Sequence, residues 1–337
     1  MNANEPFSRR DDGSGPDGRN KRIWLNIGQA AVTIAVMAFL FQRMDKALLF
    51  AALDNLTPAV IAVSLALLFL LNAVCFLRWR VFLEILSLPA PAFLLIRFNI
   101  IGFFFNQLLP TGLGGDAVKG WLLHRTAGLP GSEVAISVLA DRLAGLFWLS
   151  LFTTAGAPFF VQASGDVLLN FLVRLASLIP FCFFGAYFVI RRLAEKAGFW
   201  REKMAFVRRL NEVAALSCRS LRHVLAVMAV SVVNQMALIG IFWLIGRDIG
   251  LGLSFGRCFL IVPLAILFSM LPVSLGGWGV RETVFASLAK ALGGDLEPAV
   301  LTSALYGLVQ MAASLPGAAV WLFHKNDPGG DSGKVGD

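Results

Sequence analysis

A glycine-rich segment with two opposite charges interrupts a sequence that is otherwise strongly apolar. Residues 109–120 read LPTGLGGDAVKG and directly follow the apolar run 93–109. A backbone without helical hydrogen bonds persists at membrane depth only when it is buried in protein or lines a water-filled cavity. Between membrane-embedded runs, this segment must therefore fold into the protein. That requirement limits the possible folds more than any other feature of the sequence.

The same pattern recurs in the second half of the chain. Residues 271–282 read LPVSLGGWGVRE, and an ungapped alignment with 109–120 places Lys119 opposite Arg281. The shared pattern LPxxLGGxxV[KR] indicates an internal repeat. Glycine at a hairpin tip permits close packing or a positive φ angle. We expect these roles for Gly112, Gly114, Gly115, Gly276 and Gly277.

The composition is that of a membrane protein. Hydrophobic residues make up 57% of the chain and charged residues only 15%, whereas soluble domains carry about 25% charged residues. The net charge of +8 lies mainly in loops that flank apolar runs, where the positive-inside bias explains it, so we expect no nucleic-acid partner. The four cysteines and three histidines are scattered without ligand spacing, and we therefore expect no metal and no cofactor.

Eight apolar runs are candidates for membrane helices, since a hydrocarbon core of about 30 Å needs roughly 20 helical residues. They are 23–41, 58–77, 93–109, 133–157, 167–190, 224–246, 257–275 and 299–323. No small-residue cleavage site closes the first run, so we expect a retained span. Residues 1–22 and 326–337 have little to bury, and we expect disordered tails around a membrane domain at 23–325.

Lysine and arginine in the connections indicate which runs cross the membrane. The nine basic residues of 191–222 favour the cytoplasmic side, as do those of the N-terminal segment and of 78–97, whereas 158–166 has no basic residue. If all eight runs crossed, 191–222 would lie outside. To keep these connections on their assigned sides of the membrane, residues 93–130 must enter and leave by the inner face. Residues 257–297 must likewise enter and leave by the outer face.

The sequence therefore predicts an all-α polytopic membrane protein with six full spans and two re-entrant helical hairpins. The two repeats, at about 23–157 and 167–323, have opposite orientations, and both termini are cytoplasmic. Inverted repeats with broken helices are typical of many secondary transporters. The alternative is that both glycine-rich segments are surface loops joining eight full spans.

Two adjacent charges, Asp141 and Arg142, lie inside the apolar run 133–157. Asp141 would be about 12 Å deep, where a charge costs on the order of 2.5–3.5 kcal/mol and usually faces a partner or a wet cavity. Neighbouring side chains point about 100° apart, so at least one should meet another element, with Asp116 and Lys119 as candidates. The pair fits either a structural ion pair or a transport role, as a cation that meets a lipid phosphate or an acid that titrates.

Other polar residues complete the candidate site. Asn99 and Asn106 share one helical face, which suits a wet cavity better than lipid. Arg78 and Arg80 close the second span and are interpreted as snorkelling anchors. The candidate lipid-binding residues are Arg142, Lys119, Arg281, Asn99 and Asn106, and the candidate charge partners are Asp116, Asp141 and Glu282.

Three common catalytic patterns are missing from the sequence. It contains no DDxxD motif of prenyl-transfer enzymes, no HExxH motif and no phosphate-binding Gly-Lys-Ser/Thr. No connection is long enough to hold a soluble catalytic domain. We therefore do not expect an enzyme, and a membrane-embedded enzyme or subunit of lipid or glycan assembly is the alternative.

Three motifs in order, LPTGLGGDAVKGWLL, VLADRLAGL and LPVSLGGWGVRE, give the chain a family resemblance. Over roughly 24–325 it resembles the lysylphosphatidylglycerol synthase transmembrane-region family, whose members are flippase-like integral membrane proteins. The resemblance implies movement of a lipid between leaflets of the cytoplasmic membrane. An anionic or aminoacylated phospholipid and a polyprenyl- or hopanoid-type lipid are the candidate substrates.

The bifunctional members of this family carry an additional aminoacyltransferase domain. The present sequence has none after residue 325, so lysyl transfer is not expected from it. The partners that the resemblance implies are membrane lipids, with a separate lipid-modifying enzyme as a further candidate.

Overall fold

The computed structural model describes residues 54, 56–109, 114–196, 205–270 and 277–325, and these form helices joined by short connections. The helices are α3 (Pro58–Ile85), α4 (Ala92–Leu108), α5 (Gly114–Ala127), α6 (Gly131–Ala163), α7 (Val167–Ser177), α8 (Ile179–Lys196), α9 (Ala205–Arg219), α10 (Leu221–Asp248), α11 (Phe255–Ser269), α12 (Val280–Ala291) and α13 (Leu296–Lys325). The predicted first span at 23–41 lies outside the described residues.

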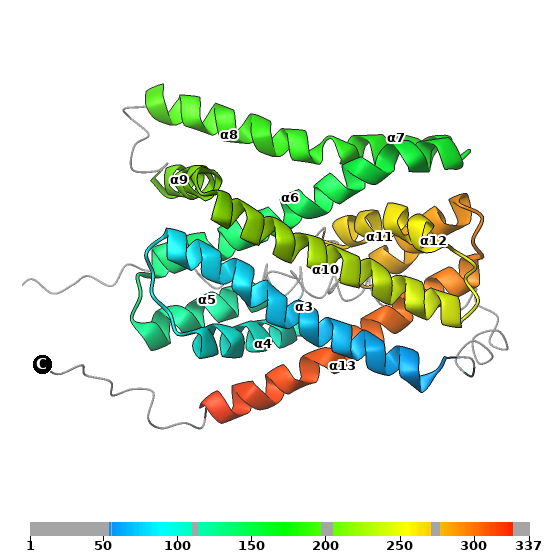
Figure 1. Cartoon of the computed structure of the whole chain (residues 1–337), viewed down its shortest axis with the longest axis horizontal. Coiled ribbons are helices and arrows are strands. Elements are labelled where there is room, and N and C mark those ends of the chain that lie inside the picture. The colour runs from blue at the N-terminus through cyan, green and yellow to red at the C-terminus, as the bar shows by residue number, and fades with distance from the viewer. Residues whose placement is uncertain (1–53, 55, 110–113, 197–204, 271–276, 326–337) are drawn as a thin grey trace, which may run out of the picture.

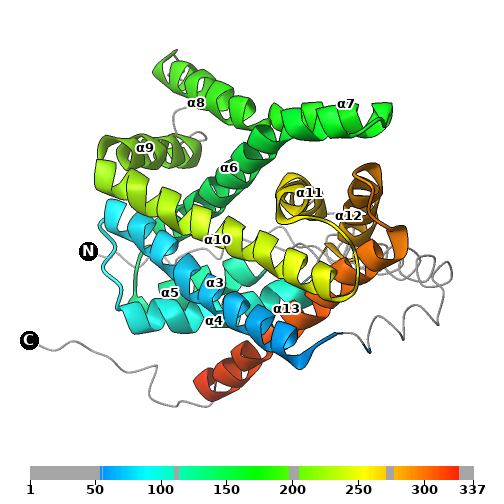
Figure 2. The same ribbon diagram turned by 45° about the vertical axis from the view of Figure 1, so that its right-hand side comes forward.

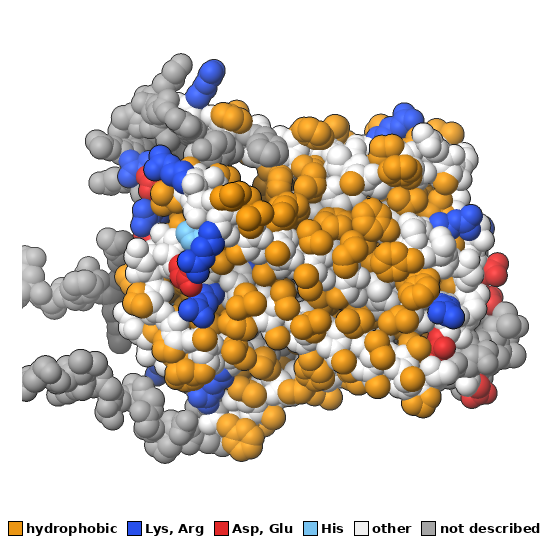
Figure 3. Space-filling model, viewed as in Figure 1, with side chains coloured by type: hydrophobic (Ala, Val, Ile, Leu, Met, Phe, Trp, Pro, Cys, Tyr) orange, Lys and Arg blue, Asp and Glu red, His pale blue; other side chains and the backbone are white. Residues whose placement is uncertain are grey.

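The described part is an all-α polytopic membrane protein. Four of its helices, α3, α6, α10 and α13, are long and apolar enough to cross a bilayer. A broad band of hydrophobic side chains covers the middle of the surface, and lysine and arginine side chains gather toward the two ends (Figure 3). Such a band is expected where lipid tails surround a protein, because charged side chains are costly at that depth.

Two pairs of helices form hairpins that open toward opposite ends of the bundle. The α4–α5 hairpin opens toward the end where α3 finishes and α6 begins, whereas the α11–α12 hairpin opens toward the end where α10 finishes and α13 begins (Figure 1). The turned view shows the same arrangement, with α7 and α8 along the outer side of α6 (Figure 2). The predicted tip residues Gly112 and Gly276 lie outside the described residues.

Glycine allows the two helices of the first hairpin to pack at backbone distance. A Cβ atom at Gly115 would overlap the carbonyl oxygen of Gly102, and one at Gly102 would lie 2.9 Å from the carbonyl oxygen of Gly115. The Gly115 N–H donates to Asn106 Oδ1 at 2.9 Å, so a side chain of α4 satisfies a free amide in the first turn of α5. In the second hairpin, Gly277 has a φ angle of 78°, which side chains rarely allow.

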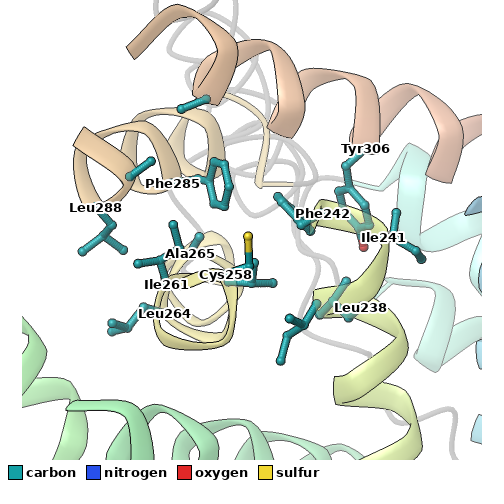
Figure 4. Packing of buried hydrophobic residues seen from close by; sticks show 14 of the residues in the cluster. Leu238, Ile241, Phe242, Cys258, Ile261, Leu264, Ala265, Phe285, Leu288 and Tyr306 are labelled. Carbon is teal, nitrogen blue, oxygen red and sulfur yellow. The ribbon is translucent and has the colours of Figure 1, made fainter. Parts of the chain in front are cut away.

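Aromatic packing holds the second hairpin in place. The ring of Phe242 on α10 lies 4.9 Å from that of Phe285 on α12 and 4.5 Å from that of Tyr306 on α13, centroid to centroid. Figure 4 shows these rings beside Cys258 and Ile261 of α11. A separate cluster, which includes buried Trp79, Phe98, Leu123 and Ile136, holds the first hairpin against α3 and α6.

The apolar run 167–190 forms two helices, α7 and α8. The helix is interrupted at Leu178, which separates α7 from α8. Pro180 has no N–H to donate to the carbonyl of Ala176, so the hydrogen-bond ladder is broken there. The charge of the connection 191–222 predicts its side of the membrane but not its structure. It contains the amphipathic helix α9, whose Val213 side chain is fully buried.

Candidate functional site

A cavity of about 260 Å³ lies between the first hairpin and helices α3, α6, α10 and α11. The apolar part of its wall includes Ile266 of α11 and Met270, the residue that follows this helix. Its polar lining residues are Asn72, Cys75, Arg78, Asn99, Asn106, Asp116, Lys119, Asp141, Arg142, Asn234 and Gln235. Six of the eight candidate residues singled out from the sequence therefore meet at one cavity, and Arg281 and Glu282 do not line it.

Asp116 connects two of the cations at this cavity. It lies in the first turn of α5, where the helix dipole favours a negative charge. One carboxylate oxygen accepts from Lys119 Nζ at 2.9 Å, and the other accepts from an Nη of Arg142 on α6. The pair Asp116–Arg142 thus joins the tip of the first hairpin to the neighbouring span.

Asp141 connects the same cluster to α3. Its Oδ1 accepts from Arg78 Nε at 2.7 Å, and its Oδ2 lies 3.6 Å from Lys119 Nζ. Arg78 also donates from Nη1 to Ser231 Oγ on α10 at 3.3 Å. Gly145 leaves space for the guanidinium, because a Cβ there would lie 2.9 Å from Arg78 Nη2. Asp141 and Arg142 therefore have different partners, as their different directions on the helix require.

The interpretation of Arg78 as a snorkelling anchor is wrong. Its side chain is only 9% exposed and is paired inside the protein, whereas Arg80 is exposed and pairs with Glu84 at 3.0 Å. The apolar run ends at residue 77, but α3 continues to Ile85. Arg78 therefore lies about two turns inside the helix, and not at its end.

The charges at the cavity do not balance. Among the described residues that line it there are three cations, Arg78, Lys119 and Arg142, and two carboxylates, Asp116 and Asp141. The formal charge of this group, which we term the cation cluster, is therefore +1. Arg142 has the most exposed side chain of the three cations, at 23% against 9% for Arg78 and 5% for Lys119. Arg142 is thus the cation best placed to meet an anion in the cavity.

The two candidate asparagines line the cavity and also hold helices together. Asn99 Nδ2 donates to the carbonyl oxygen of Asn72 at 2.9 Å, which ties α4 to α3. Asn106 Oδ1 accepts from the amide of Gly115 at the start of α5. Both side chains therefore have structural roles in addition to any contact with a ligand.

The aligned charges of the second hairpin lie in a closed environment. Arg281 Nη2 donates to Glu282 Oε1 at 2.6 Å and to the carbonyl oxygen of Ser303 at 3.1 Å. The rings of Trp278 and Tyr306 lie 5.2 and 5.0 Å from its guanidinium carbon. Arg281 is 3% exposed and is enclosed by these groups, whereas the aligned cation Lys119 lines the cavity.

Sequence reasoning did not single out four polar residues that line the cavity, namely Asn72, Cys75, Asn234 and Gln235. Asn234 and Gln235 form a polar pair inside the apolar run 224–246, which is the same signal that marked Asp141 and Arg142. Asn234 Oδ1 accepts from Cys75 Sγ at 3.5 Å. Asn234 and Gln235 extend the polar wall of the cavity from the first repeat to α10 of the second.

One serine has the GxSxG spacing of a hydrolase nucleophile, at residues 252–256. That motif works on a sharp turn between a strand and a helix. Here Ser254 follows α10 and caps α11, where its Oγ accepts from the amide of Arg257 at 3.3 Å. Within the described residues, no group of three histidine, cysteine or acidic side chains could hold a metal ion.

Comparison with known families agrees with this architecture. The family described as the lysylphosphatidylglycerol synthase TM region matches residues 26–317. The chain belongs to this family. The matched segment contains both hairpins and the complete cation cluster. A search of curated proteins finds no match.

Proposed function

We propose that this protein moves a lipid with an anionic headgroup between the leaflets of the cytoplasmic membrane. The observation that carries the proposal is the cation cluster, in which a net charge of +1 lines a cavity inside a membrane protein. Membership of a family of lipid-handling membrane regions supports it. Phospholipids and isoprenoid phosphates both supply the anion.

Arg142 has the central role in this proposal. A guanidinium binds phosphate through two parallel hydrogen bonds, a geometry that lysine lacks. When no lipid is bound, Asp116 holds Arg142. A lipid phosphate that enters the cavity replaces Asp116 on Arg142, and Lys119 remains as the partner of Asp116. The exchange keeps every charge paired while the phosphate is inside the membrane.

The two hairpins supply the route in this proposal. The first enters from the cytoplasmic side and the second from the outside, with both termini in the cytoplasm. Movement of the two repeats against each other exposes the cavity alternately to each leaflet, as in other transporters built from inverted repeats. The support is the opposite opening of α4–α5 and α11–α12 in the fold (Figure 1).

Reconstitution of the purified full chain into liposomes tests the proposal. Fluorescent phosphatidylglycerol is placed in both leaflets, and a membrane-impermeant reductant reports how much reaches the outer leaflet. The expected result is loss of all the fluorescence with protein and of about half without it. Chromatography of the extracted lipid should show unchanged headgroups. A changed headgroup would instead support the membrane-embedded enzyme.

A further inference from the structure

One hydrogen-bonding group at the cavity is left unused by the ion pairs. Gln235 lines the cavity from α10 and is 4% exposed, and its Nε2 has no hydrogen-bond partner among the described residues. Buried amide groups in proteins are nearly always paired, so an unpaired one needs an explanation. An acceptor on a molecule in the cavity would supply the partner once the amide turns its buried Nε2 toward the cavity.

Gln235 lies close to the cation cluster. Ser231, four residues earlier on α10, accepts from Arg78 Nη1 at 3.3 Å. Residues four apart lie on the same helix face, about 6 Å apart along the axis. Gln235 and the three cations line one cavity, so a ligand that fills it can meet a cation with its phosphate and Gln235 with another oxygen.

The cluster also limits the charge of that ligand. Both carboxylates are engaged, Asp116 by Lys119 and Arg142, and Asp141 by Arg78 and Lys119. No third acid lines the described wall of the cavity. A single negative charge balances the cluster, whereas an additional ammonium group would find no free carboxylate and would be repelled.

The size of the cavity fits a headgroup alone. Its volume of about 260 Å³ is below the roughly 300–1,000 Å³ of pockets that enclose drug-sized molecules. Acyl chains would therefore remain outside, among the apolar side chains of the bundle surface. The chemistry that fits is a compact, singly charged phosphate with a neutral polar extension.

From these contacts we infer that the site selects a phosphodiester lipid with an uncharged, hydroxyl-bearing headgroup, such as phosphatidylglycerol, and excludes its aminoacylated form. Gln235 is the residue that recognises the hydroxyl group. The inference rests on the proposed function and narrows its substrate class. The preferred lipid would therefore differ from lysylphosphatidylglycerol, the lipid in the description of the family.

A binding panel tests the inference separately from transport. Calorimetry on the full chain in uncharged detergent compares short-chain phosphatidylglycerol, phosphatidylmethanol, lysylphosphatidylglycerol and inorganic phosphate. Phosphatidylmethanol has the same phosphodiester charge without the hydroxyl groups. We expect phosphatidylglycerol to bind about fivefold more tightly than phosphatidylmethanol and at least about tenfold more tightly than the other two, in line with one hydrogen bond and one charge.

The decisive variant is Gln235→Met, which keeps the volume and removes the amide. It should lose the preference for phosphatidylglycerol over phosphatidylmethanol, whereas Gln310→Met on α13, away from the cavity lining, should keep that preference. Gel filtration and a melting temperature like that of the wild type show that each variant is folded.

Three outcomes would overturn the inference: tight binding of lysylphosphatidylglycerol, retention of the preference in Gln235→Met, or inorganic phosphate binding as tightly as the lipid. If the protein prefers phosphatidylglycerol but moves no lipid in liposomes, the transport proposal is refuted and the headgroup assignment remains. If it moves lipid without that preference, the headgroup assignment is refuted and the transport proposal remains.

Discussion

Arg78 Nε donates to Asp141 Oδ1 at 2.7 Å and joins α3 to α6 at the wall of the cavity. Both side chains are more than nine-tenths buried. Removing one partner of a buried ion pair leaves the other charge without compensation, which costs about 3–5 kcal/mol. This pair therefore contributes to the integrity of the membrane domain before any ligand binds.

The variant Arg78→Met should lower the stability by about 1.5–3 kcal/mol, the range for a lost hydrogen bond to a charged group, because Lys119 Nζ still lies 3.6 Å from Asp141 Oδ2. Arg80→Met, two residues along the same helix, removes an exposed pair and should cost less than about 1 kcal/mol. Thermal unfolding in detergent measures both. Asp141→Asn removes the carboxylate that Arg78 and Lys119 share and should cost more, about 3–5 kcal/mol. An Asp141→Asn protein of normal stability with no lipid movement would instead indicate that Asp141 titrates during transport.

The close contact at the first hairpin predicts a second result. Gly115→Ala should prevent normal packing of α4 against α5, because the added carbon would overlap the carbonyl oxygen of Gly102. Gly185→Ala is the control, since no described atom lies within 4 Å of the added carbon and alanine favours a helix by about 0.5–1 kcal/mol over glycine. Accumulation in the membrane and gel filtration measure the difference. A fully active Gly115→Ala protein would show that the hairpin tolerates wider spacing.

The enclosed pair of the second hairpin predicts loss of stability when its cation is removed. Arg281→Met leaves the Glu282 carboxylate, which is fully buried, with the amide of Gly279 and Ser303 Oγ as its remaining partners. We expect destabilisation by about 3–5 kcal/mol in the same unfolding assay. Normal stability together with blocked lipid movement would place Arg281 on the lipid route.

Topology is testable by cysteine labelling in a background that lacks the four native cysteines. Thr126→Cys, near the C-terminal end of α5, should react with an impermeant maleimide only from the cytoplasmic side. Asp295→Cys, before α13, should react only from outside. Both positions are exposed and lie at the open ends of the two hairpins. Labelling of both from one side would rule out the opposite orientation of the repeats.

The helical fold and the convergence of charges follow from local features of the sequence. Apolar runs of membrane length predict helices, and a charged pair inside such a run predicts partners on another element. The structure supplies those partners for Asp141 and Arg142 from α3 and α5. Arg281 and Glu282 could not be placed in this way. The alignment of the two motifs does not reveal which of the two lines a cavity.

The details that sequence reasoning missed depend on hydrogen bonding and on where helices end. The interruption at Leu178 follows from the missing amide of Pro180, within a run that hydropathy alone reads as continuous. The fall in hydropathy at residue 77 predicts a helix end beside Arg78, but the hydrogen-bond ladder of α3 continues to Ile85. The unpaired amide of Gln235 becomes visible only when all its neighbours are known.

The phosphate exchange on Arg142 is the central claim, and lipid movement by Arg142→Gln in liposomes tests it most directly. The variant keeps a polar side chain beside Asp116, which retains Lys119 as a partner, so the protein should still accumulate and fold. We predict movement at the rate of protein-free liposomes for Arg142→Gln and partial activity for Arg142→Lys, because lysine keeps the charge and loses the bidentate geometry. Wild-type rates of phosphatidylglycerol movement by Arg142→Gln would contradict the claim and leave Arg142 as a structural partner of Asp116.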